Sequence, residues 1–369
     1  MLQPMRRPVK RVTFVLPDFE AGGAQRVVVA IANGLDRSRF IPSILALDAR
    51  GPWRDMVAEH VTVTSLGHPR LRHGFAALRS ALRRAAPDII VSTIGYLNLG
   101  VLMSRPAASR VIVRESNTPS QTPTGIVSRL AQRLGYVLLY RRADCVISPS
   151  ELIAEELACD YRVPRDLIQV IRNPVDEVAL RAAAAPPRRR PGKGARFVAV
   201  GRLSRQKGYD RLLETLSSYE GDLHVSIFGE GEERTSLEGQ SRSLGLAGRV
   251  AFAGFDPNPA PWISGADALL LPSRWEGLPN VALEALACGT PVIATPESGG
   301  IHEIAKLAKP GAVTIAPMGA EFIAAMAAAR ANDNGQLRAS LLPNEFQLAV
   351  VIADFERHLD SVLQEERRA

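Results

Sequence analysis

The stretch 266–295, ADALLLPSRWEGLPNVALEALACGTPVIAT, constrains the fold more than any other part of the chain. Its first apolar run, 267–271, is typical of a buried strand in a parallel sheet. After a loop, Pro279 suits the first turn of a helix, and Gly289 is placed to cap the end of that helix. Residues 291–295 read as the next strand. The stretch therefore predicts a strand–loop–helix–strand unit of an open α/β sheet.

Two carboxylates lie in this unit. Glu276 falls in the loop beyond the carboxyl end of a strand, where open α/β sheets bind ligands, and Glu284 falls on the following helix. A carboxylate can accept two hydroxyls at once, which suits it to sugars and ribose. The spacing of eight alone is a weak signal, because Glu230 and Glu238 share it. The alternative is a solvated Glu in the loop and a Glu on the helix surface.

The whole stretch resembles the donor-site signature of the family 4 retaining glycosyltransferases, also called glycosyl transferases group 1. The resemblance implies an α/β protein of the GT-B type, with two Rossmann-like doubly wound domains facing a cleft and a C-terminal helix that crosses back to the first domain. It implies that Glu276 holds hydroxyls of the donor sugar and that Glu284 holds the ribose. It also assigns Gly277, Leu278 and Pro279 to the nucleotide site.

A second set of candidates follows the predicted strand 196–200. Arg202 and Lys207 are five residues apart across a strand-to-helix loop and can direct two cations at one point. In the resembling family such positions bind the donor pyrophosphate; the alternative is two exposed surface cations. Gly229 and Gly231 begin a G-x-G-x-x-R pattern that lacks the third Gly of a dinucleotide fingerprint. It resembles instead the family's tight turn beneath the nucleotide.

Gly22 and Gly23 open a helix after the first predicted strand, 11–16, and can present bare N–H groups to a phosphate. GGAQR resembles the family's Gly-Gly loop over the donor diphosphate, although a plain turn is the alternative. The rest of this half alternates strands and helices, which predicts a parallel doubly wound sheet. Strands are expected at 43–47, 61–66, 88–93, 110–114 and 144–148, and helices at 24–35, 75–85, 126–142 and 151–159.

Polar clusters follow two of these strands. The segments STIGYLN and RESN resemble a subgroup of polysaccharide-assembly transferases, with an Arg and a Ser exchanged, and no His of the family's kind stands at a strand end. Polar residues are common in any loop, so an ordinary loop is the alternative. The resemblance implies acceptor contacts from Tyr96, Asn98, Arg114 and Asn117.

The length of 369 residues predicts two domains. Residues 1–181 are expected to form an acceptor-binding Rossmann-like domain, and the Pro- and Arg-rich segment 182–195 reads as a linker. A nucleotide-sugar-binding domain, 196–343, follows. The amphipathic segment 344–369 is expected to return to the first domain.

Charge is divided unevenly. Residues 1–190 carry 28 Lys and Arg against 16 Asp and Glu, a net charge of +12, whereas residues 191–369 carry 17 against 22. A basic half suggests an anionic partner, and no nucleic-acid-binding motif accompanies it, so we expect phosphate-bearing lipid or sugar and no nucleic acid.

The three Cys have no metal or redox spacing, and no apolar run reaches membrane-spanning length, which together predict a cytoplasmic protein.

The predicted helix 126–142 is amphipathic and basic. One interpretation is a core-packing helix with a solvated basic edge; the other is a helix that lies in an anionic membrane surface. The resemblance to polysaccharide-assembly enzymes, whose acceptors are often lipid-linked, favours peripheral binding at the inner face of the cell membrane. The apolar stripe comprises Ile126, Leu130, Leu134, Val137 and Leu138, and the arginines are Arg129, Arg133, Arg141 and Arg142.

The implied reaction moves a sugar, as in a hexosyltransferase, from a UDP- or GDP-linked donor to a hydroxyl of a glycan or lipid-linked acceptor, with retention of configuration. No Asp-x-Asp occurs in the sequence, so we expect no metal and no cofactor besides the donor. Arg202, Lys207 and the Gly22-Gly23 amides would stabilise the leaving diphosphate, and Glu276 would orient the sugar. A sugar-nucleotide epimerase of the same build and a noncatalytic partner subunit are the alternatives; the missing third Gly disfavours an NAD enzyme.

Overall fold

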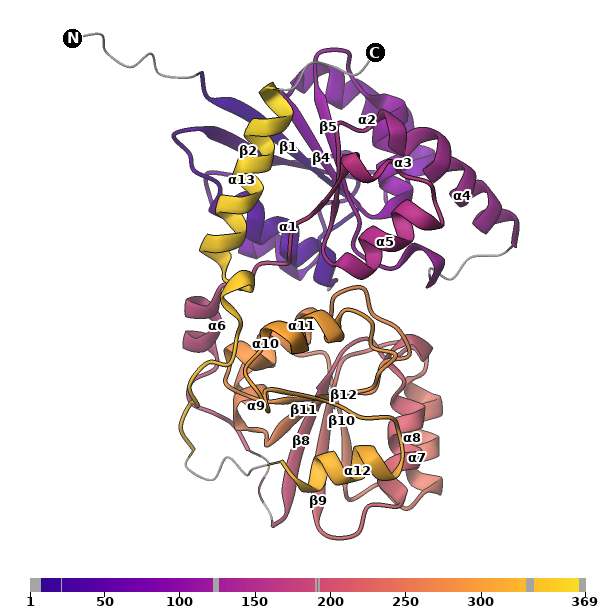
Figure 1. Cartoon of the computed structure of the whole chain (residues 1–369), viewed down its shortest axis with the longest axis vertical. Helices are drawn as coiled ribbons and strands as arrows, with labels where there is room; N and C mark the ends of the chain where they lie inside the picture. The colour runs from indigo at the N-terminus through magenta and orange to yellow at the C-terminus, as the bar shows by residue number, and fades with distance from the viewer. Residues whose placement is uncertain are drawn as a thin grey trace, which may run out of the picture. The chain divides into compact units, whose positions relative to one another are not determined.

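The structure is a computed structural model that describes residues 8–20, 22–121, 126–189, 191, 193–329 and 335–364, without the side chains of 126–129. The chain divides into two compact units (Figure 1). The first unit comprises Met1–Pro174 and Leu348–Ala369, and the second comprises Val175–Gln347. None of the described helices is both long and apolar enough to cross a membrane.

The first unit is a seven-stranded parallel sheet with helices on both faces, as the alternating pattern predicts. Helices α1 and α13 pack on one face, and α2 to α5 pack on the other. The strand order is β3-β2-β1-β4-β5-β6-β7. The strands are β1 (Lys10–Leu16), β2 (Phe40–Ala46), β3 (Thr62–Ser65), β4 (Ile89–Thr93), β5 (Arg110–Arg114), β6 (Cys145–Ser148) and β7 (Ile168–Val170). The helices are α1 (Gly23–Gly34), α2 (Leu71–Ala85), α3 (Gly95–Ser104), α4 (Ile126–Leu139), α5 (Glu151–Cys159) and α13 (Leu348–Gln364).

Helix α3 is absent from the sequence-based prediction, which treats its first residues as a polar loop. Leu97, Val101 and Leu102 are all fully buried, and the segment is apolar around its circumference. Such a helix shows no one-sided stripe, and its two glycines lower its helix propensity. Asn98 therefore lies within a buried helix rather than in a loop.

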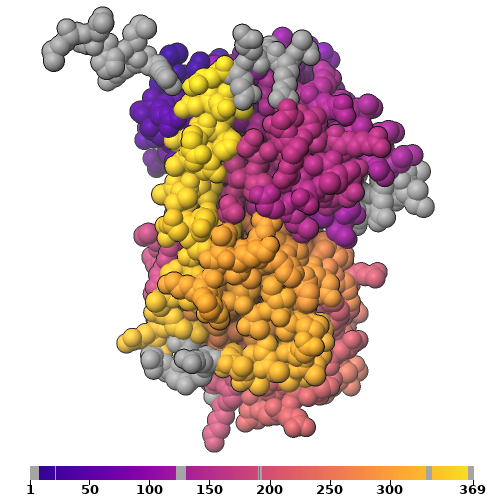
Figure 2. All heavy atoms as spheres, in the orientation of Figure 1, coloured from indigo at the N-terminus to yellow at the C-terminus, as the bar shows by residue number. Residues whose placement is uncertain are grey.

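The C-terminal helix α13 returns to the first unit, as the resemblance implies, and lies along its surface in yellow in Figure 2. Its Phe355 is fully buried in the same core as Phe14, with the ring centroids 6.2 Å apart. Arg39 binds α13 through two ion pairs, at 2.5 Å to Glu356 and 2.6 Å to Asp360. Apolar burial and charge together fix this helix to the sheet.

The second unit is a six-stranded parallel sheet of order β10-β9-β8-β11-β12-β13. Helices α6, α9, α10 and α11 pack on one face, and α7, α8 and α12 pack on the other. The strands are β8 (Ala195–Val200), β9 (Leu223–Phe228), β10 (Val250–Gly254), β11 (Ala268–Leu271), β12 (Val292–Ala294) and β13 (Val313–Ile315). The helices are α6 (Glu177–Ala183), α7 (Tyr209–Ser217), α8 (Arg234–Ser243), α9 (Ala260–Gly265), α10 (Asn280–Ala287), α11 (Ile301–Leu307) and α12 (Ala320–Ala327).

The boundary expected at 181/182 falls inside α6. Leu180 and Ala184 of this region are buried in the core of the second unit, beside Ala282 and Leu286 of α10. The contacts therefore divide the chain after Pro174, before the Pro- and Arg-rich segment begins.

In the second sheet the chain order reverses between β8 and β11, which pair directly with each other. The carboxyl ends of two such neighbouring strands open the crevice in which doubly wound sheets bind ligands. The loop with Arg202 and Lys207 follows β8, and the loop with Glu276 follows β11. The fold therefore brings both predicted loops to this switch point.

Candidate functional site

An ion pair joins the two loops at the switch point. Lys207 Nζ lies 2.7 Å from Glu276 Oε1, and the side chains are 18% and 8% exposed. Ser273 Oγ donates to the same oxygen at 2.6 Å. Withdrawal from water strengthens such a charge-assisted contact. Glu276 and Lys207, chosen from separate sequence motifs, thus form one small polar centre.

The loop that carries Glu276 is fixed by hydrogen bonds from the end of β12. Thr295 Oγ1 donates to the carbonyl of Ser273 at 2.7 Å, and Ser298 Oγ lies 3.3 Å from the same carbonyl. Gly300 N donates to the carbonyl of Gly277 at 3.1 Å. These contacts leave the Glu276 loop little freedom, which is what an orienting residue requires.

Two glycines allow the loops after β8, β9 and β11 to touch. A Cβ on Gly229 would lie 2.0 Å from the carbonyl oxygen of Gly201, and Gly229 also has a φ of 140°. A Cβ on Gly208 would lie 2.1 Å from the carbonyl oxygen of Pro272. Any side chain there would push the strand ends apart, so these glycines set the geometry of the switch point.

The remaining predicted donor residues lie in the same part of the second unit. Arg202 is exposed directly after β8, and Glu284 is half-buried on α10. Gly231 approaches the backbone of Leu203 so closely that a Cβ would lie 2.2 Å from its carbonyl oxygen. Gly277, Leu278 and Pro279 are buried between the loop after β11 and the start of α10.

Sequence reasoning missed the residues that brace this site. Arg274 donates to both carboxylate oxygens of Asp210, at 2.7 and 2.6 Å, and Gln206 Nε2 donates to the carbonyl of Trp275 at 3.0 Å. Tyr209 lies buried beneath the site, where burial, reinforced by the charge of Glu276, raises the pKa of its phenol. Arg274 and Trp275 belong to the stretch SRWEG, but their partners come from the start of α7 and from the loop before it, which no local pattern reveals.

In the first unit, Gly22 is the N-cap of α1, and Gly23 is the first residue of that helix. The expectation of two bare amides is wrong for Gly22, because its N–H donates to the carbonyl of Glu20 at 2.6 Å. Gln25 folds over this turn, and a Cβ on Gly22 would lie 2.2 Å from its Oε1. A larger residue at position 22 would therefore have to displace the side chain of Gln25.

The predicted acceptor residues separate into two groups. Tyr96, at the start of α3, is 49% exposed, and Asn117 is exposed after β5. Asn98 and Arg114 are 0% and 2% exposed, so Asn98 is not in an open loop and neither side chain is open to an acceptor. Arg114 donates to Asn173, and Asn98 Nδ2 donates to the carbonyl of Arg114 at 3.1 Å. Both side chains therefore stabilise the carboxyl-terminal end of β5 from inside the protein.

Glu115 is the centre of this buried network and was not among the predicted site residues. Its carboxylate accepts hydrogen bonds from Tyr140 and from Asn98 Nδ2, the latter at 3.0 Å, and it is 2% exposed. Burial raises the pKa of Glu115 to about 7, even though the hydrogen bonds and nearby Arg114 oppose this. Tyr140 comes from the inward face of the 126–142 region, so no local sequence pattern links it to Glu115.

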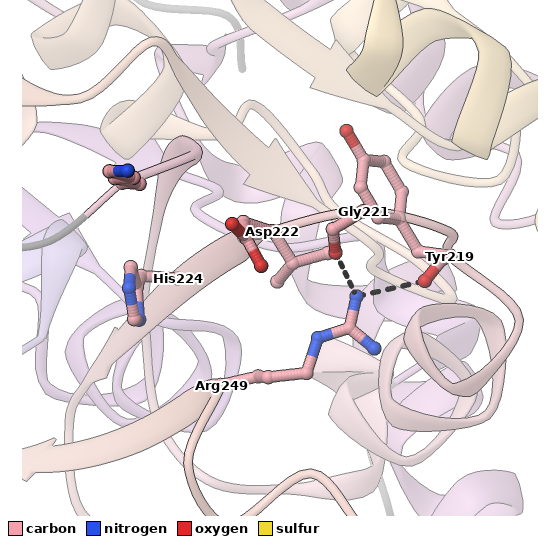
Figure 3. A pocket seen from close by; sticks show the side chains of 7 residues that line it. Tyr219, Gly221, Asp222, His224 and Arg249 are labelled. Atoms are coloured by element: carbon pink, nitrogen blue, oxygen red, sulfur yellow. Dashed lines mark hydrogen bonds between the residues drawn. The ribbon is translucent and has the colours of Figure 1, made fainter.

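A separate hollow of about 510 Å³ lies at the opposite, amino-terminal edge of the second sheet (Figure 3). Arg249 crosses it and donates to the carbonyls of Tyr219 and Gly221, at 2.9 and 3.1 Å. His224 and Asp222 line the same hollow. The guanidinium thus holds the turn before β9, and the hollow is not part of the switch-point site.

Among the described residues, no group of three or more His, Cys, Asp or Glu side chains is arranged to hold a metal ion. The cations at the switch point are side chains of Arg and Lys.

Two family descriptions match the chain in succession: Glycosyltransferase Family 4 over residues 21–178, and Glycosyl transferases group 1 over residues 182–344. The chain belongs to the family 4, group 1 glycosyltransferases.

Individual relatives agree with this membership. The glycosyltransferase is 27% identical over 284 residues to "Lipopolysaccharide core biosynthesis glycosyltransferase LpsE" of Rhizobium meliloti (strain 1021), covering 75% of this chain and 77% of the relative. It is 28% identical over 336 residues to the 2-deoxystreptamine glucosyltransferase of Streptomyces kanamyceticus, covering 80% and 83%.

Solved structures confirm the GT-B fold of this glycosyltransferase. Anabaena Alr3699/HepE in complex with UDP and glucose superposes with a TM-score of 0.75 at 19% identity, covering 95% of this chain and 100% of that one. WaaG, described as a glycosyltransferase involved in lipopolysaccharide biosynthesis, superposes with a TM-score of 0.65 at 17% identity, covering 95% of each chain.

Proposed function

We propose that this glycosyltransferase moves a hexose from a nucleotide-diphosphate sugar, UDP- or GDP-linked, to a hydroxyl acceptor with retention of configuration. The observation that carries the proposal is the Lys207–Glu276 pair at the switch point of the second sheet. Glu276 would accept hydroxyls of the donor sugar, while Lys207 and the exposed Arg202 would bind the pyrophosphate. Glu284 would hold the ribose, and Gly23 at the N-terminus of α1 remains a proposed phosphate contact.

The proposed step needs no side-chain nucleophile. The bond between sugar C1 and the phosphate oxygen breaks, and the acceptor oxygen bonds to C1 on the same face. The acceptor proton passes to the phosphate oxygen that leaves. Negative charge develops on the diphosphate in this step, and the side chains of Arg202 and Lys207 would stabilise it.

Relatives support the assignment of substrate class. UDP and glucose are bound in the HepE structure, and the name of LpsE places that relative in lipopolysaccharide core biosynthesis. A further relative, from Campylobacter jejuni, is named for transfer to a diphospho-undecaprenol-linked sugar; it is 27% identical over 202 residues, 53% of each chain. We therefore propose a glycan or lipid-linked acceptor in cell-surface polysaccharide synthesis, reached from the cytoplasm at the inner face of the cell membrane.

A screen of nucleotide sugars for protection against thermal unfolding tests the donor assignment. A ligand at a hundred times its Kd stabilises the folded state by about 2.7 kcal/mol. We expect one UDP- or GDP-sugar to raise Tm, and NAD to have no effect. Protection by NAD alone would contradict the proposal. Formation of a free sugar epimer without acceptor would instead indicate an epimerase, and donor binding without any transfer would indicate a noncatalytic subunit.

Activity should survive chelation by EDTA. The charges that a metal would supply to the diphosphate are supplied here by Arg202 and Lys207, so removal of divalent ions leaves the leaving group stabilised. Initial rates with and without EDTA should agree, and Mg²⁺ added after dialysis should not raise them. A reversible, absolute requirement for a divalent ion would show that the diphosphate is bound in another way.

The variant Tyr96→Phe should raise the acceptor KM about two- to tenfold, the effect of one lost hydrogen bond of about 0.5–1.5 kcal/mol. Burial and the nearby charge of Asp18 raise the pKa of Tyr96, so its phenol stays protonated and can donate at neutral pH. Thermal protection by the donor should remain as in the wild type. An unchanged acceptor KM would remove Tyr96 from the acceptor site.

A further inference from the structure

Helix α4 presents three leucines to solvent. Leu130, Leu134 and Leu138 are 61%, 52% and 65% exposed, and their spacing of four places them in one stripe. These three leucines of the predicted stripe therefore do not pack into the core; Val137 is half-buried, and the side chain of Ile126 lies outside the described residues. Three exposed leucines in one row are costly in water and call for a partner surface.

The opposite face of the same region fixes it to the first unit. Tyr136 and Tyr140 are buried and stacked, with ring centroids 4.3 Å apart, and Tyr140 binds the buried Glu115. A Cβ on Gly135 would lie 2.8 Å from Leu99 Cδ1, so α4 packs closely on α3. Figure 1 shows α4 at the periphery of the first unit. The leucine stripe therefore lies on the outer surface of a helix whose opposite face anchors it to the first unit.

The charge beside the stripe selects the partner. Residues 126–142 contain four arginines and no acidic residue. Arg133, Arg141 and Arg142 are exposed; the side chain of the fourth, Arg129, lies outside the described residues. A row of leucines in a segment whose charged residues are all arginines matches the boundary between acyl chains and anionic headgroups. A second copy of this chain would bring like charges together, which disfavours a dimer through this face.

We propose that the outer face of α4 and of the short turn that follows it is the surface by which this protein docks on an anionic lipid bilayer; it comprises Leu130, Leu134, Leu138, Arg133, Arg141 and Arg142. The leucines enter the headgroup boundary, and the arginines bind lipid phosphates. The inference rests on the proposed function only in that docking would bring the active site to a lipid-linked acceptor.

Flotation with vesicles tests the docking without any sugar nucleotide. The full chain should bind vesicles of phosphatidylcholine mixed with phosphatidylglycerol at low salt, bind weakly to phosphatidylcholine alone, and be released as salt is raised. The triple variant R133Q/R141Q/R142Q should bind on the order of a hundredfold more weakly, from about 1 kcal/mol for each Arg. The triple variant L130Q/L134Q/L138Q should bind the same vesicles more than about tenfold more weakly than the wild type.

Matched controls separate position from net charge. The variant R72Q/R79Q/R83Q removes three exposed arginines from α2, and Leu152→Gln removes a leucine on α5 that is 45% exposed. Both should bind vesicles like the wild type. Equal loss in the α2 variant would overturn the proposal in favour of nonspecific charge attraction. Failure of the wild type to float at low salt, or a dimer by light scattering that the leucine variant abolishes, would overturn it as well. Donor protection in the thermal screen is independent of each of these results.

Discussion

Replacement of Glu276 by Ala should lower kcat/KM about ten- to a hundredfold while the protein stays folded. The substitution removes a charged hydrogen-bond partner, which costs about 1.5–3 kcal/mol where the transition state depends on it. The folded state should tolerate the change, because Glu276 lies in a loop that Thr295 and Ser298 hold through its backbone. Initial rates with the donor found in the thermal screen, together with Tm, measure both effects.

A double-mutant cycle sharpens this test. Lys207→Met should also lower activity, and the double variant should lose less than the product of the two single effects, because both side chains belong to one ion pair. Glu321→Ala, an exposed residue on α12, is the matched control and should be fully active. Near-normal turnover in Glu276→Ala would reject the assignment of this residue to the donor sugar.

The second large effect is expected on stability, and it depends on pH. Burial raises the pKa of Glu115 from 4.5 to about 7. Between about pH 4.5 and about pH 7 the folded protein therefore keeps a proton on Glu115 that the unfolded chain has lost. The stabilisation is complete below about pH 4.5 and is lost as pH rises to about 7. The free energy of unfolding should fall by about 2–3 kcal/mol across this window because of Glu115, at 1.36 kcal/mol for each pKa unit.

Glu115→Gln keeps the shape and removes the titration. The difference in unfolding free energy between variant and wild type should therefore shift in favour of the variant by about 2–3 kcal/mol between about pH 5 and about pH 8. Urea unfolding can be followed through Trp53 in a W262F/W275F background, because Trp53 is then the only Trp and lies in the first unit. Glu155→Gln, exposed on α5, should show no such shift. A pH-independent difference for Glu115→Gln would show that the carboxyl is ionised throughout.

The doubly wound sheets could be predicted because each strand is a short apolar run bounded by turn residues. Both switch-point loops follow from such runs, and Glu276 and Lys207 could be chosen before their 2.7 Å contact was known. The sequence does not show which residue each of these side chains contacts in the folded protein. Ser273 is local to Glu276, but Asp210, which binds Arg274, comes from 64 residues away.

The first unit shows where periodicity misleads. The stripe of leucines in 126–142 is a regular apolar pattern, yet it faces solvent, while Tyr136 and Tyr140 of the other face enter the core. Conversely, α3 is largely buried, and its apolar residues are spread around the helix, so it offers no one-sided stripe to detect. The sequence does not reveal Glu115 for the same reason, because its partners lie on α3 and in the short turn that follows α4.

The path of the chain through the two units gives the protein a modular character. The chain leaves the first unit after Pro174 and re-enters it at Leu348, and at that crossing Val175 N donates to the carbonyl of Phe346 at 2.8 Å. The second unit is therefore an insert with neighbouring ends, placed ahead of the helix that completes the first unit's core. Under the proposed assignment of the donor to the second unit and the acceptor to the first, we expect donor preference to follow residues 175–347 when they are grafted between the same two junctions of a related enzyme.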